Sequence, residues 1–427
     1  MHMPGHKGKA QLGFEKYDIT EIVGADSLYH ANGIIKQSEE NATSLFGTSA
    51  TLYSTEGSSH VIRAMLYLCK LYSNDKNGYV LASRNAHSSF ISACVLNDLD
   101  IEWIYPDSNG SYLSCVVTEE KLRNTLTRMD KSPICVYITS PDYLGNMCDI
   151  SALSRVCREH GTVLIVDNAH GAYLKFLEND LHPISNGALM CCDSAHKTLP
   201  VLTGGAYLHI SKNAPEFFRE NSKQALSMFG STSPSYLTLA SLDNANKYLS
   251  DGYCERLNRF VSDLNNRKKR CKLFQGQATS KLCEPMKITI EAKKFGYRGD
   301  DFAAILENSG IACEFFDEDY VVLMPSVETE EEELDTLFSA LEAMELKNPI
   351  EEVENKLIPP KKAMTVREAA FAQRELVSAA CALGRILAIS TVSCPPAVSV
   401  IVCGEQFNES ALALCKKYGF SSFYVVK

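Results

Sequence analysis

Two apolar runs that end abruptly in polar residues constrain the fold of this chain most. Residues 162–166 read Thr-Val-Leu-Ile-Val and are followed by Asp167; residues 188–192 are followed by Asp-Ser-Ala-His-Lys-Thr at 193–198. Continuous runs of this kind are typical of strands buried on both faces of a parallel α/β sheet. Such folds place ligands at the carboxyl ends of their strands, so we expect Asp167, His170 and Lys197 to lie together.

This grouping predicts a particular chemistry. A lysine that forms a Schiff base and an aspartate that pairs with a pyridine nitrogen are what a protein contributes to pyridoxal 5'-phosphate (PLP) catalysis. Taken alone, residues 194–197 would be a solvated loop and Asp167 a helix cap. Their order after two strands favours Lys197 as the Schiff-base lysine and Asp167 as the pyridine partner. The sequence lacks the glycine-rich nucleotide, zinc-protease and serine-hydrolase motifs that would compete with this interpretation.

Composition narrows the class of protein. The chain has 427 residues, 45% of them hydrophobic and 22% charged, which is ordinary for a globular protein with one large and one smaller domain. A net charge of −10 argues against nucleic acid or an anionic membrane as partner. No apolar stretch approaches the roughly 20 residues that a bilayer crossing needs, and no secretory leader is evident, so we expect a cytoplasmic protein. Its 16 scattered cysteines are expected to be reduced core residues, and no metal site is expected.

Strand-like and helix-like stretches alternate along the chain, which predicts a mostly parallel α/β sheet. We expect a large PLP-binding domain over residues 1–250, beginning with a loop-rich arm to about residue 55, and a smaller α+β domain over 251–427. The predicted strands are residues 79–82, 101–105, 134–138, 205–210, 286–290, 320–324, 398–402 and 423–426, besides the two above. Three predicted helices begin at Gly57, at about Asp300 and in the acidic run 328–333. Two more are predicted over residues 236–257 and 366–388.

Other polar residues follow the predicted strands. Gly57, Ser58 and Ser59 open a helix, where backbone N–H groups and two hydroxyls could bind a phosphate or simply cap the helix. Ser194 and His196 flank Lys197 and could hold the same phosphate. His87 could stack on a pyridine ring or cap the following helix. His170 could orient Asp167 or face a substrate, and residues 139–143 form a stiff turn whose hydroxyls could reach the cofactor.

With these residues in place, the chain resembles the Orn/Lys/Arg decarboxylase family of fold-type-I PLP-dependent enzymes. The resemblance covers nearly the whole chain, and its most specific parts are the motifs around Asp167 and Lys197. The matching segments are residues 2–7, 18–21, 33–35, 57–59, 84–87, 140–143, 167–172, 194–200, 231–236, 394–397 and 404–405.

The resemblance implies a fold-type-I, transferase-like large domain with PLP on Lys197, Asp167 against the pyridinium and His87 stacked on the ring. It places Ser58, Ser59, Ser194 and His196 around the phosphate. It also implies a homodimer or higher oligomer, in which the loop 231–236 approaches the site of the other subunit, so Thr232 and Ser233 would act in trans.

The chain departs from the usual pattern of the family in three ways. Asn168 stands where the family usually has Glu, which removes a charge beside Asp167. Ala86 and Ser88 replace a commoner Cys and Lys around His87. The chain begins almost at the first motif, so we expect a short arm and no N-terminal wing domain.

The expected reaction is α-decarboxylation of arginine, lysine or ornithine, giving CO2 and a polyamine-type amine. Lys197 or His196 would return the proton to Cα, and the acids Glu314, Asp317 and Asp319, ahead of a predicted strand of the small domain, would meet the distal cation of the substrate. The same cofactor apparatus also serves aminotransferases and other lyases, or a PLP-binding protein without turnover, so these alternatives stay open.

Overall fold

The computed structural model describes residues 2–9, 11–75, 78–106, 113–275, 282–351, 358–393 and 399–427. The large domain contains strands β1 (Ala50–Ser54), β2 (Tyr79–Ser83), β3 (Asp100–Ile104), β4 (Cys135–Thr139), β5 (Leu164–Asp167), β6 (Met190–Asp193) and β7 (Ala206–Ile210). Its helices are α1 (Ile34–Phe46), α2 (Gly57–Ser73), α3 (Ser88–Asn97), α4 (Glu119–Thr127), α5 (Ile150–Glu159), α6 (Ala195–Thr198), α7 (Glu216–Ser227) and α8 (Tyr236–Ser250).

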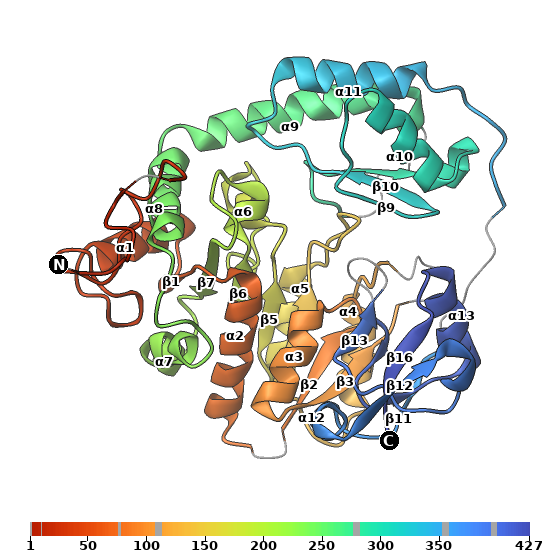
Figure 1. Cartoon of the computed structure of the whole chain (residues 1–427), viewed down its shortest axis with the longest axis horizontal. Coiled ribbons are helices and arrows are strands. Elements are labelled where there is room, and N and C mark those ends of the chain that lie inside the picture. The colour runs from red at the N-terminus through yellow and green to blue at the C-terminus, as the bar shows by residue number, and fades with distance from the viewer. Residues whose placement is uncertain are drawn as a thin grey trace.

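These seven strands form one sheet in the order β1-β7-β6-β5-β4-β2-β3, with helices on both faces (Figure 1). Strands β2 to β6 run parallel to one another, whereas β7 is antiparallel to both of its neighbours. The predicted mostly parallel α/β fold is therefore confirmed, and the expected strands lie within one or two residues of their predicted limits.

The sheet is buried on both faces, which explains the continuous apolar runs of the sequence. Ile165 and Cys192 pack with α2 and α3 on one face, whereas Val166 and Cys191 pack with α4 and α5 on the other. Because side chains alternate along a strand, Asp167 and Asp193 emerge on opposite faces at the carboxyl ends of β5 and β6. This edge of the sheet therefore carries polar groups on both sides.

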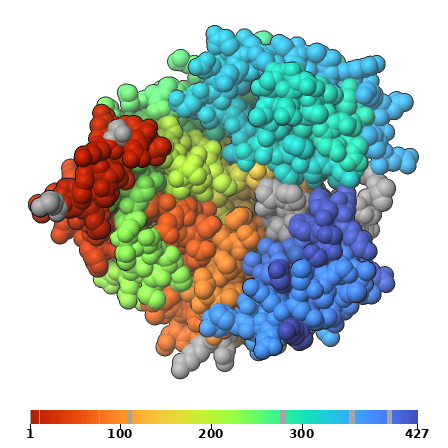
Figure 2. Space-filling model, in the orientation of Figure 1, coloured from red at the N-terminus to blue at the C-terminus, as the bar shows by residue number. Residues whose placement is uncertain are grey.

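The second half of the chain begins with α9 (Tyr253–Arg270) and contains two separate hydrophobic cores. The first holds β8 (Ile288–Glu291), α10 (Gly299–Asn308), β9 (Phe315–Phe316), β10 (Tyr320–Leu323) and α11 (Glu331–Ala343). After it come β11 (Lys361–Lys362), α12 (Val366–Phe371), β12 (Arg374–Ser378), β13 (Thr391–Ser393), β14 (Ser399–Val402), β15 (Glu405–Gln406), α13 (Glu409–Lys417) and β16 (Ser422–Val426). Figure 2 shows the two regions in cyan and blue beside the large domain. The single domain over 251–427 stays a prediction.

Two predicted helices were wrong, and two elements of the arm were not predicted. The loop-rich arm also contains α1 and β1; the buried face of α1 includes the polar residues Ser38 and Glu39, which form hydrogen bonds with Tyr53, so the helix lacks a continuous apolar spacing. The helix predicted over 236–257 is two helices, since Gly252 takes a left-handed conformation with φ of 63°. The helix predicted over 366–388 ends at Phe371, because β12 pairs with β16 instead.

Among the helices of the described residues, none combines the length and the apolar character that crossing a bilayer requires.

Candidate active site

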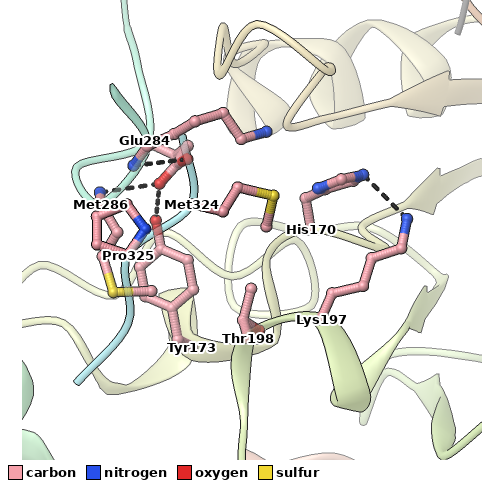
Figure 3. A pocket seen from close by; sticks show the side chains of 9 residues that line it. His170, Tyr173, Lys197, Thr198, Glu284, Met286, Met324 and Pro325 are labelled. Atoms are coloured by element: carbon pink, nitrogen blue, oxygen red, sulfur yellow. Dashed lines mark hydrogen bonds between the residues drawn. The ribbon is translucent and has the colours of Figure 1, made fainter. Parts of the chain in front are cut away.

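Lys197 lies on α6, the short helix that follows β6, and its side chain protrudes into a pocket (Figure 3). Its Nζ atom is 3.0 Å from Nε2 of His170, which is buried after β5. Desolvation by the pocket walls lowers the pKa of Lys197, while Asp167 opposes that change. A lysine with a lowered pKa loses its proton more readily and becomes a nucleophile. The pocket is lined by His170, Tyr173, Lys197, Thr198, Glu284, Met286, Lys287, Met324 and Pro325.

His170 is held as a neutral imidazole. Burial lowers the pKa of His170 well below its ordinary value, and the cations of Lys287 and Lys197 act in the same direction. A neutral ring can accept a hydrogen bond from the Lys197 amine, so the pair fixes the direction of that amine. From the sequence, His170 was predicted to orient Asp167 or to face a substrate; in the structure its Nε2 atom contacts Lys197.

Asp167 is buried at the end of β5 and accepts hydrogen bonds from three protein donors, one of which is the Cys192 thiol, 3.4 Å from Oδ1. Its Oδ2 atom accepts a hydrogen bond from the Tyr137 hydroxyl at 2.9 Å, and its Oδ1 atom accepts one from the Ala169 backbone N–H at 3.2 Å. Burial raises the pKa of Tyr137 well above its ordinary value, so this hydroxyl keeps its proton and remains a donor. Tyr137 was missed at the sequence level because it becomes a neighbour only through the pairing of β4 with β5.

His87 follows β2 and caps the next helix, which is one of the two roles considered for it. Its Nδ1 atom accepts a hydrogen bond from the backbone N–H of Ser89 at 3.2 Å, which caps α3. Desolvation lowers the pKa of His87, and the charge of Lys197 acts in the same direction, whereas the charge of Asp167 opposes the change. The exposed ring therefore lies within electrostatic reach of both site residues. Stacking of His87 on a cofactor ring stays a prediction.

The serines predicted to bind phosphate come from two segments that the fold joins. The Ser194 hydroxyl, after β6, donates a hydrogen bond to the Ser58 hydroxyl at 2.9 Å. Ser58 and Ser59 lie in the first turn of α2, where backbone N–H groups have no partner within the helix and can bind an anion, although that of Gly57 donates to the Gly204 carbonyl at 2.7 Å. Gly57 begins this helix with φ of 75°, a conformation that favours glycine. His196, by contrast, places its Nδ1 atom 3.0 Å from the Gly205 carbonyl, and its contact with phosphate stays a prediction.

Thr232 and Ser233 lie exposed in the loop before α8. The loop is fastened near the α2 terminus, because the Ser231 backbone N–H donates to Glu56 at 2.6 Å. Within the described part of this single chain, no hydrogen bond joins Thr232 or Ser233 to Lys197 or Asp167. Their action across a dimer stays a prediction. The Cys-Pro-Pro-Ala motif at 394–397 lies outside the described residues.

The polar groups of this edge fit PLP. Several buried polar atoms have no protein partner in the described part of the chain: Thr139 Oγ1, Thr198 Oγ1, both amide atoms of Asn85 and Nδ1 of His170. Such groups need a partner, which a polar ligand can provide. A carboxylate for the pyridine nitrogen, an amine for the aldehyde and a helix terminus for the phosphate are all present.

The three acids predicted to bind the substrate differ in their surroundings. Glu314 accepts a hydrogen bond from the Tyr143 hydroxyl at 2.7 Å, and its charge, like that of Asp167, opposes the lowering of the Lys197 pKa by burial. Asp317 accepts the backbone N–H groups of residues 319 and 320 at 2.8 and 2.7 Å. Asp319 forms an ion pair with Lys293. Of the three acids, Glu314 is therefore the one whose charge acts on Lys197, whereas Asp317 stabilises its own turn and Asp319 pairs with Lys293 and Lys417.

The fold and these side chains define a fold-type-I PLP-dependent enzyme. The structure superposes on the constitutive lysine decarboxylase of Escherichia coli with a TM-score of 0.78 at 18% identity, covering all of this chain and 79% of that one. The lysine decarboxylase LdcF of Francisella novicida gives the same TM-score, identity and coverage. At such identity the likeness establishes the fold.

Sequence comparison identifies the family. Residues 13–290 match the family described as Orn/Lys/Arg decarboxylase, major domain. An arginine decarboxylase of Halalkalibacterium halodurans is 28% identical over 97% of this chain and 89% of its own length, and the uncharacterized protein YaaO of Bacillus subtilis is 28% identical over 96% and 89%. The chain belongs to the Orn/Lys/Arg decarboxylase family and is a PLP-dependent amino-acid decarboxylase.

Proposed function

We propose that this enzyme decarboxylates a basic amino acid at Cα, with arginine as the first candidate, and releases CO2 and the corresponding amine. The observation that carries the proposal is the meeting of Lys197, His170 and Asp167 at one sheet edge, in a chain that belongs to this family. Arginine is favoured because relatives named arginine decarboxylase, at 25–28% identity, align with 95–97% of the chain.

The residues of the site would divide the work in a simple way. When bound, PLP supplies the electron sink that accepts the electron pair of the bond to the substrate carboxylate. Lys197 would hold the cofactor covalently, and Asp167, supported by the Tyr137 hydroxyl, would keep a proton on the pyridine nitrogen. The first turn of α2, with Ser58 and Ser194, would hold the phosphate.

Proton return to Cα falls to Lys197 in this proposal. Its Nζ atom is directed by His170 at 3.0 Å, and the neutral imidazole adds no charge that would stabilise the carboxylate before it leaves. His196, the other candidate, has one ring nitrogen facing the Gly205 carbonyl. This contact makes His196 the weaker candidate for the proton donor.

Substrate recognition would depend on Glu314. An ammonium or guanidinium group in a partly closed pocket needs a charged acceptor, and a carboxylate can bind a guanidinium through two oxygens. Glu314 already has one donor in Tyr143 and lies within electrostatic reach of Lys197. Thr232 and Ser233 would complete the site of the partner subunit in a homodimer, since one chain alone leaves them exposed.

Release of labelled CO2 from carboxyl-labelled arginine, lysine and ornithine tests the reaction and ranks the substrates. Borohydride reduction of the PLP-loaded protein, followed by peptide mapping, should find the pyridoxyl group on Lys197. Lys287 is a demanding comparison, because burial lowers its pKa too and it lines the same pocket. Keto acid without CO2 would indicate transamination. PLP on Lys197 without any turnover would indicate a binding protein, and label on Lys287 would contradict the assigned site.

A further inference from the structure

A buried carboxylate lies behind the cofactor loops, on the face of the sheet opposite Asp167. Asp193 ends β6 with no exposed surface, and its Oδ1 atom accepts a hydrogen bond from the Asn168 side-chain amide at 2.7 Å. Its Oδ2 atom lies 3.0 Å from Nε2 of His182 and 3.0 Å from Nε2 of His209. We call these four residues the Asp193 network.

Asp193 carries the charge of this network. Burial by itself favours the protonated acid, but His182 and His209 outweigh it and hold the pKa of Asp193 well below its usual range. Burial also lowers the pKa of His209, which favours its neutral ring. A neutral His209 donates its Nε2–H to Asp193 and accepts the Thr51 hydroxyl at Nδ1, at 2.9 Å. The network therefore consists of an ionised carboxylate surrounded by N–H donors.

A hydrogen-bonded cluster explains this geometry better than a metal site. The ligand atoms of His182, Asp193 and His209 lie within 4.8 Å of one another, as metal ligands would. A histidine that binds a metal through one nitrogen donates its other N–H to an acceptor. Nδ1 of His182 has no partner in the described part of the chain. If His182 donates its Nε2–H to Asp193, its Nδ1 atom carries no proton, so no buried N–H is left unpaired. If Nε2 bound a metal instead, Nδ1 would carry the proton and that N–H would have no acceptor among the described residues.

The network joins the two loops that carry the site. Asn168 lies between Asp167 and the loop residue His170, which contacts Lys197. Asp193 directly precedes Ser194, whose hydroxyl bonds Ser58, and the chain then turns into α6 with Lys197. The Asp193 carboxylate is thus hydrogen-bonded to the loop after β5, and Asp193 itself directly precedes the loop after β6.

We propose that Asp193 is a positioning residue for the cofactor: through Asn168 it holds the loop that carries Asp167 and His170 in register with the loop that carries Lys197. The inference rests on the proposed roles of Asp167 and Lys197. Because Asn168 is an uncharged amide, the hydrogen bond of 2.7 Å between Asn168 and Asp193 contains one negative charge, that of the Asp193 carboxylate. A carboxylate at position 168 would repel the Asp193 carboxylate and break the hydrogen bond. Moving the charge from position 193 to position 168 would preserve that bond.

Exchange of the two groups provides the test. N168D sets two carboxylates against each other, D193N removes the charge, and N168D/D193N moves the carboxylate across the same hydrogen bond while leaving an oxygen at position 193 for both histidines. PLP is titrated into the full-length, cofactor-free protein, and the dissociation constant is read from visible absorbance. We expect N168D to weaken PLP binding about tenfold or more, and the double variant to bind within about threefold of wild type.

N246D serves as the matched control. Asn246 on α8 is also a buried amide, and it donates to the Tyr53 hydroxyl at 2.8 Å without touching the cofactor loops. A carboxylate there should lower the melting temperature but leave the PLP dissociation constant within about threefold of wild type. The proposal is overturned if the double variant binds PLP no better than N168D, or if N168D and N246D change binding equally. Failure of borohydride to label Lys197 in wild type would instead overturn the proposed function.

Discussion

Arg84 and Glu405 face each other as a two-pronged ion pair, with arginine Nη1 and Nη2 at 2.7 and 2.8 Å from the two carboxylate oxygens. Arg84 is completely buried and Glu405 almost so, and the guanidinium also lies 4.8 Å from the centre of the Trp103 ring. Arg84 directly follows β2, in the segment that leads to His87, whereas Glu405 belongs to the C-terminal region. The pair therefore fastens that region to the loop that carries a site histidine.

Breaking this pair should destabilise the protein strongly. R84A leaves Glu405 buried without its cation, and losses of about 3–5 kcal/mol are usual for such a change. Urea unfolding of R84A and E405A, compared with wild type, measures the loss. R155A is the control, because Arg155 forms an exposed ion pair with Glu119 and its removal should have little effect. An R84A protein as stable as wild type would contradict the importance of the pair.

Tyr137 should contribute to cofactor binding through Asp167. Y137F removes the hydroxyl that donates to Asp167 at 2.9 Å and leaves the aromatic packing intact. Hydrogen bonds to a charged group are worth roughly 1.5–3 kcal/mol, so we expect PLP affinity to fall by about tenfold or more. Absorbance titration measures this change. Y207F is the control, because Tyr207 is equally buried but its hydroxyl has no partner in the described structure. Equal PLP affinities for Y137F and wild type would refute the role.

The central strands could be predicted because burial on both faces leaves a direct mark on the sequence. The predicted runs that correspond to β4, β5 and β6 are apolar apart from Thr162, so the polar residues after them mark the edge of the sheet. The location of Lys197 and Asp167 at this edge could therefore be predicted from the strands alone. Helix α1 could not be found in this way, since its buried polar residues, such as Glu39, are satisfied by contacts with β1 and Lys223.

The partners of the site residues depend on strand register, which the sequence does not display. Tyr137 reaches Asp167 only because β4 and β5 pair as they do, and His209 reaches Asp193 only because β7 runs antiparallel to β6. The contact of Ser58 with Ser194 joins segments 136 residues apart. Local motifs therefore identify the groups that do chemistry, whereas the groups that hold them emerge from tertiary structure.

Glu314 should determine affinity for the basic substrate. E314Q keeps the size of the side chain but removes the charge that acts on Lys197, so we expect KM for the best substrate to rise about tenfold or more while PLP absorbance stays unchanged. D317N and D319N are matched controls from the same segment. Their carboxylates bind backbone N–H groups and Lys293, so KM should change little. Wild-type KM values in all three variants would place the substrate pocket elsewhere.

His170 should make stability depend on pH in the acidic range. Because burial holds the pKa of His170 well below its ordinary value near 6.5, the unfolded chain takes up a proton at this position before the folded protein does. Stability present above pH 6.5 is therefore lost as the pH falls from that value toward the folded-state pKa, at up to about 1.4 kcal/mol per pH unit for one group. Urea unfolding of PLP-free wild type and H170Q between pH 5 and 8 should show a shallower dependence for the variant. H30Q replaces a solvent-exposed histidine and should retain the wild-type slope. Parallel curves for H170Q and wild type would mean that His170 is charged, or free to become so, in the folded protein, and the neutral imidazole assigned beside Lys197 would then be wrong.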